Sequence, residues 1–230
     1  MDRIIARSPG RDVLDVGIGT GIAARQFLTA GCTVSGVDVD ERMAELAREA
    51  GFRTDVARFE AWDPAGRSFD AVIAGQAWHW VDPVVGALKA AQVLRPAGRL
   101  APFWNVFRPP PEIASAFAEI YGRVQAEALS IAWTRPTLDL YGPIFEKTAD
   151  GMRQAGAFSA PEQWRFDWDQ PYTRDEWLDQ VPTHGQATRL PPEALGELLT
   201  GIGAALDAAG GGFTMHYTTV TVTAARHGAA

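Results

Sequence analysis

The sequence predicts an α/β fold: an open sheet of about seven strands, mostly parallel, with helices on both faces. Two observations carry this prediction. Through the first half of the chain, short apolar stretches of strand length alternate with helical stretches of about ten residues, a pattern that implies parallel pairing with right-handed crossovers. Later, two predicted strands separated by helices replace that alternation. We expect these two to lie antiparallel at the edge of the sheet.

The first half contains most of the predicted strands, which share an apolar core and end at polar or glycine residues: 12–16, 33–37, 52–57, 69–74 and 100–104. The predicted helices between them are 21–30, 40–50 and 83–94. Asp40 precedes Glu41 and an apolar periodicity of helical spacing. We therefore expect Asp40 to be the N-cap of its helix.

The pattern changes after Asn105, where three consecutive prolines at 109–111 stop any continuation. The later predicted elements are helices at 112–133, 143–155, 173–181 and 191–209 and strands at 163–168 and 213–225. No internal repeat or linker divides the sequence. We expect one domain over 1–230, with a helical lid inserted at 106–155.

Composition excludes several classes of protein. The 230 residues are 47% hydrophobic and 21% charged, too balanced for a disordered chain. The net charge of −7 comes without a basic cluster, which argues against nucleic acid as a partner. No stretch reaches the roughly 18 apolar residues of a membrane helix, and no signal-peptide core is present. We expect a cytoplasmic protein, with the single cysteine, Cys32, buried.

The chain is organised around residues 13–21. An apolar strand carries Asp15 near its end, and Gly17, Gly19 and Gly21 follow before a helix begins. Glycine permits positive φ and close approach of a ligand, and a helix start offers unpaired N–H groups. In an open parallel sheet, ligands bind at this carboxyl edge. We expect a small polar ligand on this turn.

The spacing of the glycines separates two classes of ligand. In the dinucleotide fingerprint Gly-x-Gly-x-x-Gly the third glycine would be residue 22, which is Ile22. The pattern Asp15-x-Gly17-x-Gly19-x-Gly21 instead resembles motif I of class I S-adenosylmethionine-dependent methyltransferases. The resemblance implies a Rossmann-like sheet and S-adenosyl-L-methionine as cofactor, with S-adenosyl-L-homocysteine as product.

Further residues extend this resemblance over most of the chain. Asp38, after the second strand, matches the family residue that binds both ribose hydroxyls, although a helix N-cap is an alternative role. Phe59 and Glu60 stand where the family places its adenine contacts. Gly75 and Trp78 follow the fourth strand and are expected beside the cofactor.

Residues 78–83 resemble the Trp-His-Trp-x-Asp-Pro signature of a subgroup similar to trans-aconitate methyltransferase. His79 in this segment is the candidate catalytic residue. A hydroxyl acceptor needs a base within hydrogen-bond reach, and histidine titrates near neutral pH. A carboxylate acceptor needs none, and His79 would then position the substrate or satisfy a nearby backbone group.

The acceptor pocket is expected to draw on the irregular second half. Its candidate residues are Trp80, Trp104, Asn105 and Tyr141. His184 and His216 have no metal-ligand spacing with each other or with Cys32, so we expect no metal. The sequence leaves the oligomeric state open.

The expected function is methyl transfer from S-adenosylmethionine to a small molecule, either a carboxylic acid or a hydroxyl compound. One alternative is a protein that binds S-adenosylmethionine or S-adenosylhomocysteine without catalysis. The other, an NAD-dependent oxidoreductase, is disfavoured by Ile22. Members of the resembled family normally carry a longer N-terminal region, whereas only eleven residues precede Asp12 here. We therefore expect weak cofactor affinity.

Overall fold

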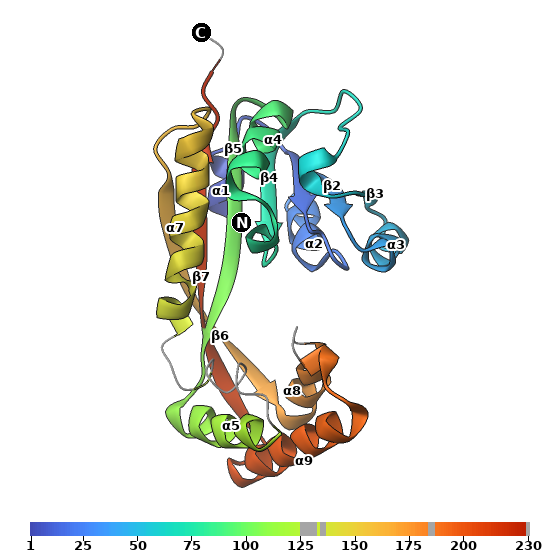
Figure 1. Ribbon diagram of the computed structural model, residues 1–230, viewed down its shortest axis with the longest axis vertical. Coiled ribbons are helices and arrows are strands. Elements are labelled where there is room, and N and C mark those ends of the chain that lie inside the picture. The colour runs from blue at the N-terminus through green and yellow to red at the C-terminus, as the bar shows by residue number, and fades with distance from the viewer. Residues whose placement is uncertain (125–132, 134–136, 184–186, 229–230) are drawn as a thin grey trace. The chain divides into compact units, whose positions relative to one another are not determined.

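The computed structural model describes residues 1–124, 133, 137–183 and 187–228. The chain forms two compact units. The first comprises Met1–Trp104, Ile144–Arg165 and Val220–Ala230, and the second comprises Asn105–Pro143 and Phe166–Thr219. Strands β5, β6 and β7 and helix α7 contribute residues to both, and each unit is described by itself below (Figure 1).

The strands, in chain order, are β1 (Asp12–Val16), β2 (Thr33–Asp38), β3 (Arg53–Val56), β4 (Phe69–Gly75), β5 (Leu94–Arg108), β6 (Glu162–Thr173) and β7 (Gly212–Ala225). The α-helices are α1 (Asp2–Ala6), α2 (Ile22–Thr29), α3 (Glu41–Glu49), α4 (Pro83–Val93), α5 (Pro111–Arg123), α7 (Thr137–Ala155), α8 (Arg174–Gln180) and α9 (Pro192–Ala208). Short 3₁₀ helices occur at η1 (Phe59–Ala61), η2 (Trp78–Trp80), η3 (Val181–Thr183) and η4 (Ala187–Arg189).

The seven strands form one sheet in the order β3-β2-β1-β4-β5-β7-β6. The pairs β2–β3, β1–β2, β1–β4 and β4–β5 are parallel. The bridge between Phe158 and Arg226 is antiparallel, and the side chains that pair between β6 and β7, Asp169 with His216 and Asp167 with Thr218, follow the same antiparallel order. The predicted fold class, including its antiparallel C-terminal edge, is confirmed.

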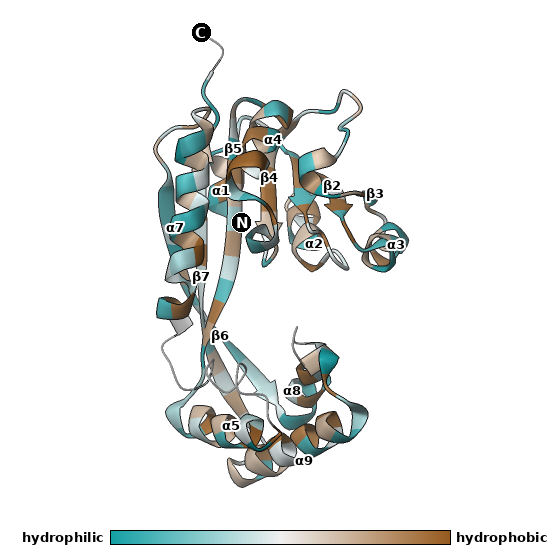
Figure 2. Ribbon diagram, viewed as in Figure 1, coloured by the Kyte–Doolittle hydropathy of each residue, from teal (hydrophilic) through white to brown (hydrophobic). Residues whose placement is uncertain are grey.

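Helices cover both faces of the sheet in the first unit. On one face, Val13, Ala71 and Ile73 form a buried cluster with residues of α1, α2 and α3. On the other, Trp104 of β5 packs against Phe145 of α7, with ring centroids 5.4 Å apart. Strand β4 is buried on both faces, and after Asp70 it continues as the apolar run of residues 71–74, which is brown in Figure 2.

Strand β5 is the main departure from the predicted elements, since it spans Leu94–Arg108 rather than 100–104. Its early part contains Pro96 and Gly98, which predict a turn, yet the strand passes them through a register shift against β4. Its late part continues because Val106 is buried beyond the polar Asn105. Alternation between faces, rather than polarity at one position, decides where the strand ends.

The second unit holds α5, α8 and α9 (Figure 1). Its core is an aromatic and aliphatic cluster in which Phe117 stacks on Trp177, with ring centroids 6.1 Å apart. Thr173 caps α8: its Oγ1 accepts a hydrogen bond from the Glu176 backbone N–H, and the Glu176 carboxylate accepts one from the Thr173 N–H. Pro192 is the first residue of α9, as its fixed φ favours.

Two features are absent from the residues that the structure describes. No helix there is both long enough and apolar enough to cross a membrane. No group of three or more His, Cys, Asp or Glu side chains in the same part of the chain is arranged to hold a metal ion. His184, one of the histidines considered from the sequence, lies outside the described residues.

Candidate functional site

The turn after β1 has three left-handed glycines, Gly17, Gly19 and Gly21, with φ of 70°, 56° and 82°. A Cβ on Gly17 would lie 2.5 Å from the Cβ of Ala77, and one on Gly21 would lie 2.7 Å from the ring of Phe52. A Cβ on Gly19 would meet nothing within 4 Å. Packing therefore accounts for two of the glycines, whereas the backbone at Gly19 faces open space.

Asp15, at the fourth position of β1, is 1% exposed. Neither of its carboxylate oxygens has a hydrogen-bond partner among the residues that the structure describes. Burial, and then the nearby charge of Asp38, raises the pKa of Asp15 from 3.8 to about 8. Buried carboxylates without partners are costly and rare in folded proteins. This arrangement therefore suits a ligand that brings a cation or N–H donors.

Asp38 ends β2 and is 9% exposed. Its Oδ2 accepts a hydrogen bond of 2.9 Å from the N–H of Gly19, and its Oδ1 accepts one of 2.9 Å from the N–H of Asp40. Asp38 thus ties the glycine turn to the end of β2. Each carboxylate oxygen has more than one lone pair, so the same side chain can still accept bonds from a ligand. The N-cap of α3 is Asp40, as predicted.

The predicted adenine contacts, Phe59 and Glu60, lie in η1. Phe59 is 3% exposed, and its ring lies 6.3 Å from Trp62 and 5.9 Å from Trp78, between centroids. Glu60 Oε1 accepts a hydrogen bond of 2.9 Å from the N–H of Asp82. These contacts order η1 and the start of α4. A role for Phe59, Glu60 or Trp78 in holding a cofactor stays a prediction.

Gly75 and Gln76 shape the end of β4. A Cβ on Gly75 would lie 3.0 Å from the ring of Phe103, so glycine permits close packing there. Gln76 has a φ of 58°, and its N–H donates to the carbonyl oxygen of Phe103 at 2.9 Å. Such strain in a non-glycine residue is typical of functional loops. Sequence reasoning missed Gln76 because its residue type gives no sign of the conformation.

His79 and Trp104 are brought together by β4 and β5. The indole Nε1–H of Trp104 donates a hydrogen bond to His79 Nδ1, at 3.3 Å. The ring of His79 also lies 4.8 Å from that of Trp80, whose residue is 80% exposed. Partial burial lowers the pKa of His79. Trp104 itself is fully buried, so it contacts His79 from within the core.

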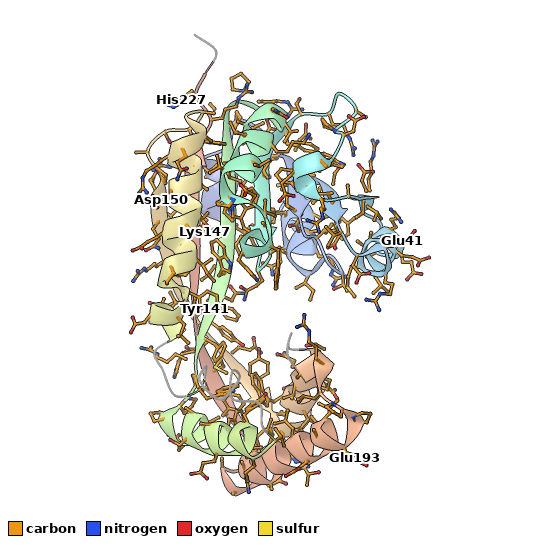
Figure 3. All side chains as sticks on the ribbon, viewed as in Figure 1. Glu41, Tyr141, Lys147, Asp150, Glu193 and His227 are labelled. Carbon is orange, nitrogen blue, oxygen red and sulfur yellow. The ribbon has the colours of Figure 1, made fainter. Side chains whose placement is uncertain are left out.

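The other two predicted acceptor residues, Asn105 and Tyr141, belong to the second unit. Asn105 Oδ1 accepts a hydrogen bond of 2.7 Å from Thr219 Oγ1, which in turn accepts one of 2.9 Å from the indole N–H of Trp168. Tyr141 is a residue of α7, and burial raises its pKa (Figure 3). Their binding of an acceptor stays a prediction.

Comparison with known proteins points to methyltransferases. Residues 14–101, which include Asp15, Asp38 and Trp78, match a family described as a methyltransferase domain. An uncharacterized methyltransferase from Mycobacterium tuberculosis is 28% identical over 185 residues, covering 80% of this chain and 68% of that protein. A demethylmenaquinone methyltransferase from Tropheryma whipplei is 35% identical over 103 residues, 43% of each chain.

Solved structures agree on the fold. A putative type II methyltransferase from Anaeromyxobacter dehalogenans superposes with a TM-score of 0.66 at 22% identity, covering 99% of this chain and 95% of that one. A putative methyltransferase from Bacillus halodurans gives a TM-score of 0.54 at 17% identity, covering 98% and 96%. At these identities the likeness concerns the fold alone.

Proposed function

We propose that this chain, a class I S-adenosylmethionine-dependent methyltransferase, methylates a small organic acceptor that is a carboxylic acid or a hydroxyl compound. The observation that carries the proposal is the buried, unpartnered carboxylate of Asp15 beside the open turn at Gly19. The methionine end of the cofactor carries two groups that complement this site: an ammonium group, which suits the carboxylate of Asp15, and a carboxylate, which suits the open backbone at Gly19.

Asp15 would pair with the ammonium group, since an opposite charge nearby favours the ionised carboxylate. The open backbone of the glycine turn would receive the carboxylate end. Asp38 would accept hydrogen bonds from the two ribose hydroxyls while it holds Gly19. Because the pKa of Asp15 is about 8 without a ligand, this pairing would release a proton at neutral pH.

S-adenosylmethionine supplies an activated methyl group on a sulfonium sulfur. The protein's task is then to hold an acceptor atom in line with that methyl group and to exclude water, and such positioning can supply roughly 7–11 kcal/mol. His79 and the exposed Trp80 adjoin the end of β4, where the acceptor would approach. An aromatic face such as that of Trp80 also favours a nearby cation.

Relatives support a small acceptor. Those whose names specify a reaction are a demethylmenaquinone methyltransferase and ubiquinone biosynthesis O-methyltransferases, although each covers less than half of this chain. The segment 106–155 remains our proposed source of acceptor specificity. Membership of the trans-aconitate subgroup likewise rests on the residues of 78–83.

The second candidate function is binding of S-adenosylmethionine or S-adenosylhomocysteine without catalysis. The open turn and Asp15 fit that role equally, so only transfer distinguishes the two. An NAD-dependent oxidoreductase fits less well, because Ile22 occupies the third glycine position and is 67% exposed. Ligand binding separates this third possibility from the first two.

Thermal shift with S-adenosylmethionine, S-adenosylhomocysteine and NAD is the first test. We expect stabilisation by the first two ligands, and stabilisation by NAD alone would overturn the proposal. Methyl-labelled S-adenosylmethionine with a panel of small carboxylic acids and phenols then tests catalysis. Glu41→Gln is a matched control for Asp15→Asn, since it removes one exposed carboxylate, that of the first residue of α3 (Figure 3).

A further inference from the structure

The hydrogen bond between Trp104 and His79 determines which imidazole nitrogen carries a proton. An indole N–H can only donate. His79 Nδ1, 3.3 Å from Trp104 Nε1, must therefore be the acceptor and cannot carry a proton itself. In a neutral imidazole the single proton is then on Nε2. This conclusion follows from the chemistry of the two groups.

Both residues are held in place. Trp104 is fully buried in β5 and packs against Phe145 of α7. His79 lies in the short helix η2, where the N–H of Trp80 donates to the carbonyl of Ala77 at 3.0 Å. Partial burial also lowers the pKa of His79, which favours the neutral ring. The Nε2–H group is thus the polar group that His79 offers beyond Trp104.

We propose that Trp104 is a positioning residue that fixes His79 as a hydrogen-bond donor through Nε2–H, and that the acceptor presents an already deprotonated oxygen to this donor. The inference rests on the proposed methyl transfer and narrows its substrate class to carboxylates and phenolates. A base at this position would need an unprotonated Nε2, and the proton would then occupy Nδ1, where it would meet the indole N–H of Trp104.

The chemistry balances without a base. A lone pair of the anionic oxygen forms the new bond to the methyl carbon, while the electrons of the carbon–sulfur bond return to sulfur. An anion and a sulfonium cation thereby become a neutral ester or ether and a thioether, and no proton has to leave. A neutral alcohol would have to lose a proton, which His79 in this state cannot take.

Nitrogen-15 NMR of the full chain labelled at histidine tests the assignment directly, with His79→Gln identifying the resonances. We expect a pyridine-like Nδ1 and a protonated Nε2 in the unmodified protein. Trp104→Phe, which keeps an aromatic ring against Phe145, should shift His79 towards a mixture of tautomers. Trp164→Phe, another buried tryptophan, is the control and should leave His79 unchanged.

A proton on Nδ1 in the unmodified protein, or an unaltered tautomer in Trp104→Phe, would overturn the proposal. Transfer of a labelled methyl group to three acceptors tests the substrate class: benzoate represents the carboxylates, 4-nitrophenol the phenolates, and benzyl alcohol the neutral alcohols. Transfer to either of the first two, retained in part by the N–H donor of His79→Gln, supports it. Transfer to benzyl alcohol that His79→Gln abolishes contradicts it. The two claims fail separately. Absence of S-adenosylmethionine binding would refute the proposed function, whereas the NMR spectra alone test the tautomer of His79.

Discussion

Replacing Asp15 with asparagine should stabilise the ligand-free protein at alkaline pH. The folded protein holds the Asp15 proton until about pH 8, whereas an unfolded chain releases it near 3.8. Between these values the folded state binds more protons, so the free energy of unfolding falls as pH rises. The fall is about 2.3 kcal/mol between pH 6 and pH 8, or about 5–10 °C in Tm for a chain of this length.

Thermal unfolding of Asp15→Asn and the unmodified protein at several pH values measures this difference. The Tm of the unmodified protein should fall more steeply from pH 6 to pH 8 than that of the variant, which has no carboxyl group to ionise there. Glu41→Gln should keep the steep slope, because its carboxylate is exposed. Parallel curves for Asp15→Asn and the unmodified protein would refute the reasoning.

Three further predictions concern the cofactor and the acceptor. Asp38→Asn should weaken S-adenosylmethionine binding by roughly 1.5–3 kcal/mol for each charge-assisted hydrogen bond lost; calorimetry showing unchanged affinity would remove Asp38 from the site. Gly19→Ala and Gly51→Ala both place alanine at a positive φ in open space, so each should cost about 1–2 kcal/mol of stability. Only Gly19→Ala should also lose cofactor affinity, and equal affinity in the two variants would argue against a ligand on the turn. His79→Gln should retain part of the methyl transfer across neutral pH, measured with labelled cofactor, and complete loss would indicate a base.

Much of the first half of the fold was predictable because each strand there has its own boundaries in the sequence. Glycine or a polar residue follows every apolar run, and Asp40 and Asp82 cap the helices that come next. Strand β5 was predicted too short, because its length depends on pairing with β4 and on burial of Val106, which are tertiary features. Local signals fix where a helix starts better than where a long strand ends.

The candidate site was predictable in its residue types and less so in its contacts. The glycine spacing indicated the turn, but packing against Ala77 and Phe52 explains two of the three glycines. The hydrogen bond from Trp104 to His79 joins residues 25 positions apart, and no sequence period predicts it. The strained φ of Gln76 is also a result of the assembled sheet. Tertiary contacts of this kind decide what His79 can do.

Calorimetric titration of the protein with S-adenosylmethionine at pH 7, in two buffers of different ionisation enthalpy, tests the central claim most directly. If the cofactor's ammonium group pairs with Asp15, binding should release about nine tenths of a proton, the fraction held by a group with a pKa near 8. Asp15→Asn should bind more weakly and release none. Binding without proton release, and with equal affinity in the variant, would contradict the account.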